Sequence, residues 1–389
     1  MKLGALAVVL AGVSSATADP LRLRGDALAT TTSPAGLLVL DGDGTLEDRV
    51  TAEAVVWMAS QRSPGEDVTG DVLVIAIRAR TRDGKRTVRV GRFVSSLGAL
   101  RPLHLDGGSL RVRLPHEVEI EGVAGIPVVL GLGTGRAWDW VVGGRVARRI
   151  ADTGSIGVAY EQRRDRGIRA SEELGVDVGA ELGKRTDAAA RLAYDLLGEG
   201  IAEVGITASH RHGAVRGELY ATQRSPSHLV PATSLFSVIG DVPAQRAGTV
   251  ITWRAAPRLD VIADLACLRV DSDLAPDVTG RARLRLDDRA AGTVTGELRR
   301  SGVGADAWIG ARLAARVPVA RGVAISTELE LVIPDEDRGR GAAWPWGLVA
   351  ASWQRADWEA AIAVEASATP EYRQRLDALF QLSRRWSTK

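Results

Sequence analysis

The chain has 389 residues, a formal net charge of +2 and a single cysteine, Cys267. The near balance of charge argues against a nucleic-acid partner, because such partners usually bind to a basic surplus. One cysteine excludes an internal disulfide framework and a cysteine-rich zinc site. His210 and His212 lie two positions apart, but two ligands do not make a metal site. We therefore expect neither a metal nor another cofactor.

The N-terminus has the features of a secretory signal peptide. A positive residue precedes the uncharged apolar run Leu3–Val13, and small residues at Ala16 and Ala18 match the pattern that a signal peptidase reads. The run is too short to cross a bilayer as a helix, which takes about 20 residues. We expect residues 1–18 to be cleaved and residues 19–389 to form the exported protein.

The first third of the chain shows strand signals of uneven strength. The strongest is a hairpin in which residues 72–82 and 86–94 flank Asp83-Gly84, a favoured turn pair. Residues 95–108 have the composition of a loop, and this loop could fold inward. Further strands are predicted at residues 21–31, 51–59, 110–114 and 118–123.

Residues 37–46, with the sequence Leu-Leu-Val-Leu-Asp-Gly-Asp-Gly-Thr-Leu, resemble the first motif of haloacid-dehalogenase-like phosphotransferases. The resemblance implies that Asp41 attacks phosphorus, that Asp43 is the general acid/base, and that both bind magnesium. That fold needs strands that alternate with helices. The segment around Lys184 alternates with period 2 instead. We therefore keep phosphotransfer as an alternative and favour a protein that is not an enzyme.

From about residue 137 to residue 386 the dominant pattern has period 2, the repeat of a β-strand. In residues 173–182, for example, leucine, valine and alanine alternate with glutamate, glycine and aspartate. Strands of soluble proteins average about 5–6 residues. These segments run nearer ten residues and recur about fifteen times, which suits tilted strands that cross a bilayer. The pattern predicts an all-β, transmembrane, antiparallel up-and-down barrel.

The predicted connections differ in length between the two ends of this barrel. Long connections fall on one side, at residues 223–247, 271–278 and 334–342. Short turns fall on the other, at residues 212–213, 255–257, 288–291 and 354–357. Such asymmetry is expected of outer-membrane barrels. We predict 18 to 20 strands, with both termini on the side of the short turns. The longest connection could constrict the lumen or cover the outer rim.

The last segment carries Leu376, Ala378, Phe380 and Leu382 on one face and ends near Trp386. This alternation before a terminal aromatic residue resembles the C-terminal signature of Gram-negative outer-membrane proteins. The chain as a whole is similar to uncharacterised barrel proteins of myxobacterial type. The resemblance implies a location in the outer membrane, contact with its lipid, and recognition of the last strand by the barrel-insertion machinery.

Two sets of side chains are candidates for functional positions in such a barrel. Charged residues on the polar faces would line the lumen: Arg211, Arg216, Arg281, Arg283, Arg285, Arg299, Arg312, Glu203, Glu218, Glu297, Glu328 and Glu330. Aromatic residues at strand ends would lie at the membrane interfaces: Trp344, Trp346, Trp353, Trp358 and Trp386.

The function predicted from these patterns is a porin-like passive channel for small polar or anionic solutes. Charged rings in a lumen set ion preference, so the ladder of Arg281, Arg283 and Arg285 would favour anions. Pairing of opposite charges across strands would remove that preference. The alternative from another class is a structural barrel that scaffolds a periplasmic or envelope partner.

Overall fold

The computed structural model describes residues 22–30, 35–46, 49–61, 69–128, 139–151, 153–224, 244–270, 272–288, 291–304, 307–336, 343–368 and 375–387. The expected signal peptide, residues 1–18, lies outside these ranges. Within them, no helix combines the length and the apolar character needed to cross a membrane.

The described chain consists of 22 strands and one short 3-10 turn. The first eleven strands are β1 (Arg22–Thr30), β2 (Ala35–Leu46), β3 (Val50–Gln61), β4 (Thr69–Arg80), β5 (Arg86–Ser95), β6 (Leu103–Arg113), β7 (Val118–Pro127), β8 (Val141–Ile150), β9 (Gly154–Asp165), β10 (Ile168–Glu181) and β11 (Thr186–Asp195). The others are β12 (Gly200–His212), β13 (Val215–Arg224), β14 (Ala244–Ala256), β15 (Leu259–Val270), β16 (Asp273–Arg285), β17 (Thr293–Ser301), β18 (Trp308–Ala320), β19 (Val323–Pro334), β20 (Trp344–Arg355), β21 (Trp358–Ser367) and β22 (Arg375–Ser387). The 3-10 turn, η1 (Pro115–Glu117), lies between β6 and β7.

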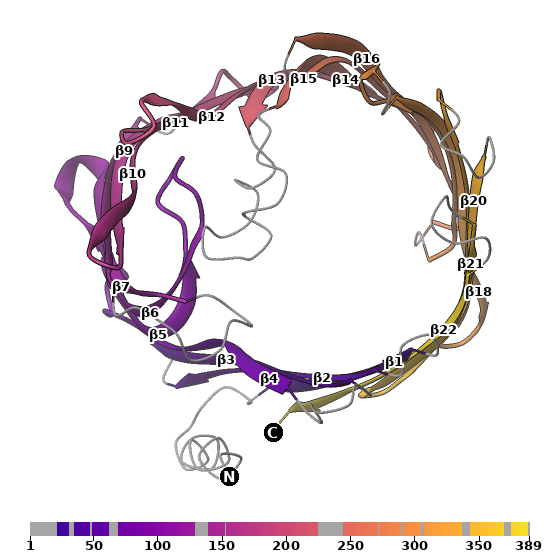
Figure 1. The fold of residues 1–389 in the computed structure, drawn as a ribbon, viewed down its shortest axis with the longest axis horizontal. Helices are drawn as coiled ribbons and strands as arrows, with labels where there is room; N and C mark the ends of the chain where they lie inside the picture. The colour runs from indigo at the N-terminus through magenta and orange to yellow at the C-terminus, as the bar shows by residue number, and fades with distance from the viewer. Residues whose placement is uncertain are drawn as a thin grey trace.

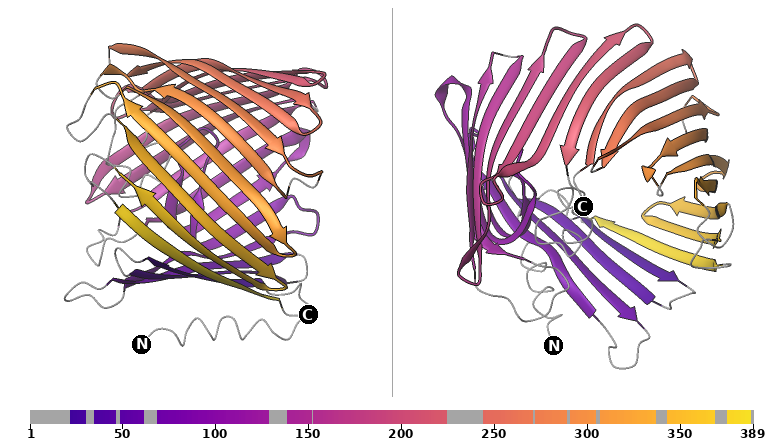
Figure 2. Two further views of the ribbon diagram at one scale, coloured as in Figure 1. Left: turned by 90° about the vertical axis from the view of Figure 1, so that its right-hand side faces the viewer. Right: turned by 45° about the horizontal axis from the view of Figure 1, so that its top comes forward.

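The sheet closes into a barrel because the last strand pairs with the first. β22 runs antiparallel to β1 from the pair Arg22–Ser387 to the pair Thr30–Leu379. Every other strand pairs with its neighbours in the chain. Figures 1 and 2 show the resulting ring of tilted strands. The predicted antiparallel up-and-down barrel is thus confirmed, and neither terminal strand has a free edge of the kind that invites aggregation.

The number of strands is larger than the predicted 18 to 20. The fifteen segments expected after residue 137 correspond to β8–β22. The strand that was not foreseen is β2, whose run of four apolar residues breaks the alternation that marks a half-polar strand. The loop predicted at 271–278 is wrong, because β16 already begins at Asp273.

The hairpin predicted around Asp83-Gly84 joins β4 to β5 and is confirmed. Gly84 has a φ of +65°, which glycine adopts without steric cost. The Asp83 carboxylate accepts hydrogen bonds from the Thr81 hydroxyl at 2.5 Å and from the Lys85 N–H at 3.1 Å. The hydrogen bond from Thr81 is the main reason that the pKa of Asp83 lies below its ordinary value.

We call the end of the barrel where β1 begins and β22 ends the terminal end, and the opposite end the loop end. The longest connections, residues 128–140 and 225–243, fall at the loop end. Connections at the terminal end include residues 213–214, 257–258 and 321–322. The predicted asymmetry between long and short connections therefore holds. Both termini of the barrel lie at the end with the short turns, as predicted.

The pairing registers divide the side chains into an inner and an outer set. Residues directly opposite one another on antiparallel strands point to the same side. Following the registers strand by strand around the closed ring assigns one consistent face that includes Arg145, Asp177 and Glu297. The segment 96–102 packs on this face, and Figure 1 shows that segment inside the ring. This face is therefore the inner one.

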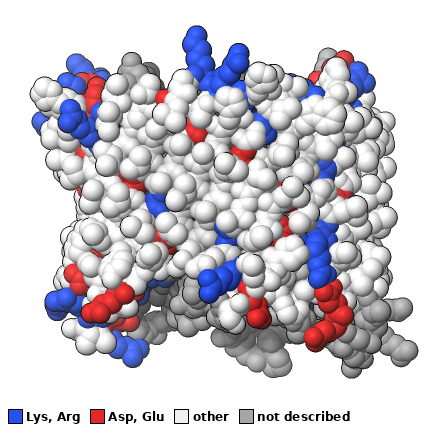
Figure 3. Space-filling view, turned by 90° about the horizontal axis from the view of Figure 1, so that it is seen from above, with Lys and Arg blue, Asp and Glu red and all other residues white. Residues whose placement is uncertain are grey.

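The outer face is apolar over the middle of the strands. Leu219, Leu298 and Ile362 all belong to this face, and each exposes more than half of its surface. Figure 3 shows the outside over β13–β16, where charged residues gather toward the two ends and uncharged residues dominate between them. Large exposed apolar side chains over the middle of the strands match a surface that faces the hydrocarbon layer of a bilayer.

An arginine placed on the outer face should destabilise the barrel in a bilayer, whereas an arginine on the adjacent inner position should not. Leu313 is an outer residue of β18, and Ala314 is an inner residue opposite Glu328. We expect Leu313→Arg to lower the free energy of unfolding by about 2–4 kcal/mol. Ala314→Arg gains an opposite charge and should change it by less than about 1 kcal/mol. Denaturant unfolding from lipid vesicles, followed by tryptophan fluorescence, measures both. Equal losses would contradict the assignment of the two faces.

Candidate functional site

The β5–β6 hairpin leaves the barrel wall at a row of three glycines. Gly91, Gly107 and Gly125 pair side by side on β5, β6 and β7. A Cβ atom at Gly91 or Gly107 would lie 2.1 Å from a backbone carbonyl oxygen, and the φ of Gly91 is +130°. Only glycine fits such a close approach. Beyond this row the β4–β5 ladder ends at the pair Ile75–Arg92, and the tips of both strands turn into the lumen (Figure 1).

Side chains cap the edge of β4 that this departure exposes. Arg92 donates to the Val72 carbonyl at 2.9 Å and to Asp71 at 3.0 Å, and it also donates to Asp106 on β6 at 2.6 and 2.9 Å. The Val72 N–H donates to the Asp71 carboxylate at 2.7 Å. His104 of β6 is also buried, with 3% of its surface exposed. Because an unpaired backbone group in a bilayer costs several kcal/mol, these contacts replace the ladder that β5 no longer provides.

Residues 96–102, which we call the inner strap, rest on glycines of the inner wall. Leu97 and Leu100 are only 1% and 3% exposed. A Cβ atom at Gly143 of β8 would lie 2.7 Å from the Leu97 side chain, and one at Gly175 of β10 would lie 2.8 Å from the Leu100 side chain. Both leucines belong to a buried apolar cluster with Phe93. This cluster fixes the strap to one side of the lumen.

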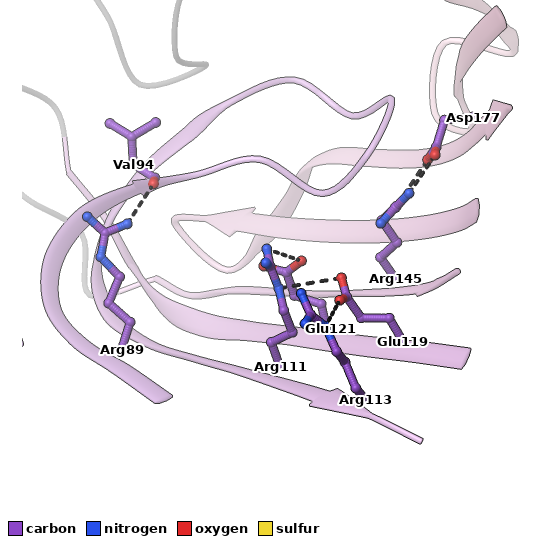
Figure 4. Close-up of polar contacts among 8 residues, drawn as sticks. All are labelled: Arg89, Val94, Arg111, Arg113, Glu119, Glu121, Arg145 and Asp177. Atoms are coloured by element: carbon purple, nitrogen blue, oxygen red, sulfur yellow. Dashed lines mark hydrogen bonds and ion pairs between the residues drawn. The ribbon is translucent and has the colours of Figure 1, made fainter. Parts of the chain in front are cut away.

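Two ion pairs also lie at the strap. Gly98 lies against Arg145 of β8 and Asp177 of β10, whose charged groups make hydrogen bonds of 3.0 and 2.5 Å (Figure 4). The guanidinium of Arg101 lies 3.5 Å from the carboxylate of Glu173, which is almost fully buried. A charge buried without a partner would be costly, so the contact between Arg101 and Glu173 adds to the attachment of the strap.

Arg89 contacts the residues at the bend of β5. Its guanidinium lies over the Phe93 ring, 4.5 Å from the centroid, and donates to the Val94 carbonyl at 3.4 Å (Figure 4). The same side chain forms an ion pair with Glu53 of β3. Arg89 therefore joins the wall, the buried cluster and the backbone at the base of the strap.

A second group of charges lines the wall between the strap and the terminal end. Arg111 of β6 lies 3.2 Å from Glu121 and 3.5 Å from Glu119 on β7, and Arg113 lies 3.1 Å from Glu119 (Figure 4). These contacts join adjacent strands, as the registers require. The wall here is polar and close to neutral.

The registers place the twelve charged residues expected in the lumen on the inner face of the sheet. Most of them form ion pairs, either within one strand or between strands that lie close together in the sheet. Arg281 donates to Glu297 at 2.6 Å, and Arg312 lies 2.7 Å from Glu328. The remaining contacts are Arg299 with Glu297 at 3.1 Å and with Glu330, Arg216 with Glu218 at 3.5 Å, Arg285 with Asp260 at 2.9 Å, and Glu203 with Arg191.

The expected arginine ladder of β16 is largely neutralised. Arg281 and Arg285 each face a carboxylate, Glu297 and Asp260 respectively. Among the described residues, Arg283 has no ion pair and is exposed. Arg211, at the terminal end of β12, likewise has no ion pair within the described ranges. Pairing across strands therefore leaves isolated free arginines in place of a continuous cationic ladder.

Trp344 and Trp346 point to the inner face, which corrects their predicted place at the membrane interface. Both occupy inner-face positions of β20, which alternate with outer-face positions along the strand; we call this the inner parity. The Trp346 Nε1–H donates to the Glu365 carboxylate at 2.9 Å. Alternation puts two tryptophans two positions apart on one side of a strand. It does not reveal which side that is when alanine and leucine occupy both faces.

Trp353, Trp358 and Trp386 have the outer parity and lie at the terminal end of their strands. The Arg384 guanidinium lies over the rings of Trp358 and Trp386, 4.7 and 5.1 Å from their centroids. Their place at a membrane interface remains a prediction, to which this arrangement adds a cation within reach of lipid headgroups.

The segment that resembles the phosphotransferase motif is strand β2. Asp41 and Asp43 pair with β1 on one side and with β3 on the other, in an antiparallel sheet. The haloacid-dehalogenase-like fold instead needs a strand followed by a helix. That alternative is therefore wrong. The predicted constriction at residues 223–247 lies mostly outside the described residues, since β13 ends at Arg224 and β14 begins at Ala244.

The inward loop predicted at residues 95–108 is present as the strap, although residues 103–108 belong to β6. Sequence reasoning missed the three aligned glycines and the role of Arg92. The available signal was Gly91 inside an otherwise regular alternation of valine and arginine, since an isolated glycine in a strand often marks a close backbone approach.

A large side chain at Gly175, where Leu100 packs, should detach the strap from the wall. A leucine at Gly175 would meet the Leu100 side chain, while Gly280 on the outer face has open space at its Cβ position and provides a matched control. We expect Gly175→Leu to make the chain susceptible to thermolysin at the bond between Ala99 and Leu100, and Gly280→Leu to leave this bond as resistant as in the native protein. Mass spectrometry of the fragments identifies the bond. A resistant Ala99–Leu100 bond in folded Gly175→Leu would contradict the proposed attachment.

Comparison with known proteins identifies the architecture alone. No protein family and no curated protein matches the sequence. Among solved structures, the ferric enterobactin receptor PfeA of Pseudomonas aeruginosa matches with a TM-score of 0.62 and 8% identity, over 95% of this chain and 82% of the receptor. The translocation pore of the P pilus usher PapC matches with a TM-score of 0.51 and 10% identity, over 96% of this chain and all of the pore. A P pilus tip assembly intermediate of E. coli matches with a TM-score of 0.57 and 10% identity, over 95% of this chain and 61% of the matched chain. The chain shares its fold with outer-membrane β-barrels.

Proposed function

We propose that the protein is a porin-like passive channel of the outer membrane that admits small polar solutes, including anions. The observation that best supports this is the contrast between the two faces of the closed barrel. The inner face carries arginines and carboxylates that pair across strands, and the outer face carries leucine, valine and isoleucine. A polar inner wall inside an apolar shell is the arrangement of a water-filled pore.

The strap gives this pore a restriction on one side. It is held on the inner wall of β8–β10 by Leu97, Leu100 and the Arg101–Glu173 contact. Solutes would pass beside it, against the ion-paired wall formed by the later strands. Because neighbouring charges there largely cancel, this part of the wall is polar and close to neutral, which suits small hydrated solutes.

The proposed location follows from the same faces. The apolar band would contact outer-membrane lipid, and residues 1–18 would direct export. The last strand, β22, exposes Leu376 and Phe380 on its outer face and would be the segment that the barrel-insertion machinery engages. The pore itself uses no metal or other cofactor in this proposal.

Removal of the strap should widen the channel. We expect the native protein to conduct ions in planar lipid bilayers with a stable unitary conductance. Replacing residues 96–101 by a short glycine-serine linker should raise that conductance, because the linker lacks the leucines that fill the lumen side of β8 and β10. Gly280→Leu, on the outer face, serves as the control and should conduct like the native protein.

The absence of current from correctly folded native protein would contradict the channel. Folding is checked independently by a β-rich circular dichroism spectrum and by a gel band that shifts on boiling. A folded barrel that carries no current would favour the scaffold function for a periplasmic or envelope partner, which needs no open lumen.

A further inference from the structure

We propose that the terminal end of the channel is an anion-collecting mouth, formed by inner-face arginines that lack ion pairs, and that the pore therefore passes current unequally in the two directions. The inference rests on the proposed channel function and adds to it a location, a ligand class and an electrical behaviour. The ligands are small oxyanions such as carboxylates and phosphates, because the planar guanidinium matches their paired oxygens.

The uncompensated arginines gather at one end of the barrel. All have the inner parity, all are exposed, and within the described residues none has an ion-pair partner. Each lies on an even-numbered strand, which runs toward the terminal end, and within four residues of that strand's last residue. We call this set the arginine arc: Arg78 (β4), Arg149 (β8), Arg211 (β12), Arg283 (β16) and Arg316 (β18).

Inner-face arginines near the loop end are compensated. Arg246 lies 2.8 Å from Asp264 and 2.5 Å from Asp277. Arg375 lies 2.7 Å from Asp377. Among the described residues, the two ends therefore differ in the pairing of their inner-face arginines, and the unpaired ones lie at the terminal end.

Carboxylates in the same sector do not cancel the arc. On the inner face near the terminal end between β4 and β18, Glu181 and Asp187 have no ion pair among the described residues. Asp187 accepts a hydrogen bond from Ser209 at 2.7 Å. Asp260 is shared by Arg254 at 3.5 Å and Arg285 at 2.9 Å, which leaves further positive charge there. Asp41 and Asp43 lie on β2, outside this sector.

The effect of the arginine arc on passing ions should depend on the salt concentration. Charges on a wide lumen act on passing ions only within the Debye length, which is about 30 Å at 10 mM salt, about 8 Å at 0.15 M and about 3 Å at 1 M. At low salt the arc should concentrate anions in the terminal mouth. Because the described residues of the loop end lack this excess, anions should accumulate in the pore for one direction of current and be depleted for the other.

The test compares two triple variants that lose equal charge at the same end of the barrel. The first, R149Q/R211Q/R283Q, removes three members of the arc. The matched control, R86Q/R148Q/R355Q, removes three exposed arginines that also lie at the terminal end but have the outer parity. Single-channel current–voltage curves and reversal potentials in KCl gradients are recorded from 10 mM to 1 M.

For the native protein and the control we expect rectification and a chloride-to-potassium permeability ratio above about 2 at 10 mM salt, falling toward about 1 at 1 M as screening increases. For the arc variant we expect a nearly symmetric curve and a ratio near 1 at all salt concentrations. Inorganic phosphate added at the terminal mouth should reduce the native current and have less effect on the arc variant.

The outcomes separate this inference from the function on which it rests. If the native protein forms no channel, the proposed function fails and the inference fails with it. If the native protein conducts but the arc variant keeps the native rectification and selectivity, the inference is overturned and the channel remains. If the control loses rectification to the same extent as the arc variant, the effect comes from net charge at the rim, and the assignment to the inner face is overturned.

Discussion

Backbone N–H and C=O groups inside a bilayer must find partners within the protein, and the rest of this structure depends on that constraint. The pairing of β22 with β1 meets it for the sheet as a whole. It also explains the contacts at the place where the β4–β5 ladder is interrupted. Where β5 turns inward, Arg92 donates to the Val72 carbonyl, and the Val72 N–H donates to Asp71. The inward hairpin is compatible with a membrane wall because side chains complete the hydrogen bonding that its departure removes.

Gly91, Gly107 and Gly125 allow the β5–β6 hairpin to bend into the lumen. They allow the backbones to approach closely enough for this bend. The leucines of the strap then pack against Gly143 and Gly175. The result is a buried apolar cluster inside a barrel whose inner wall also carries many ion-paired side chains. Burial of leucine is favourable wherever water is excluded, so the cluster holds a restriction in place without a covalent link. The position of the strap thus depends on glycines in the wall, which leave space for its leucines, as much as on the strap's own residues.

The sequence could predict the barrel because alternation is a local property. Each strand of β8–β22 shows its two faces within about ten residues, without reference to its neighbours. Two kinds of feature required the structure. Strand β2 has no such alternation over its first residues, so its motif resembled a phosphate site. Contacts between strands, such as Arg281 with Glu297, depend on register, which alternation within one strand does not determine. The inner orientation of Trp344 and Trp346 escaped prediction for the second reason.

Register also explains why most charges of the inner wall are paired and why a few arginines are not. An arginine on one strand meets a carboxylate on the next only if both lie at the same height, as Arg312 and Glu328 do. In the narrower, strap-bearing part of the lumen a free charge would be partly desolvated and costly, and Arg145 and Arg101 are paired there. At the terminal mouth water solvates a free guanidinium at little cost. Folding therefore neither requires nor forbids the arginine arc. Stability alone does not account for the position of the unpaired inner-face arginines of the described residues at one end of the barrel, whereas the proposed attraction of anions to that mouth does.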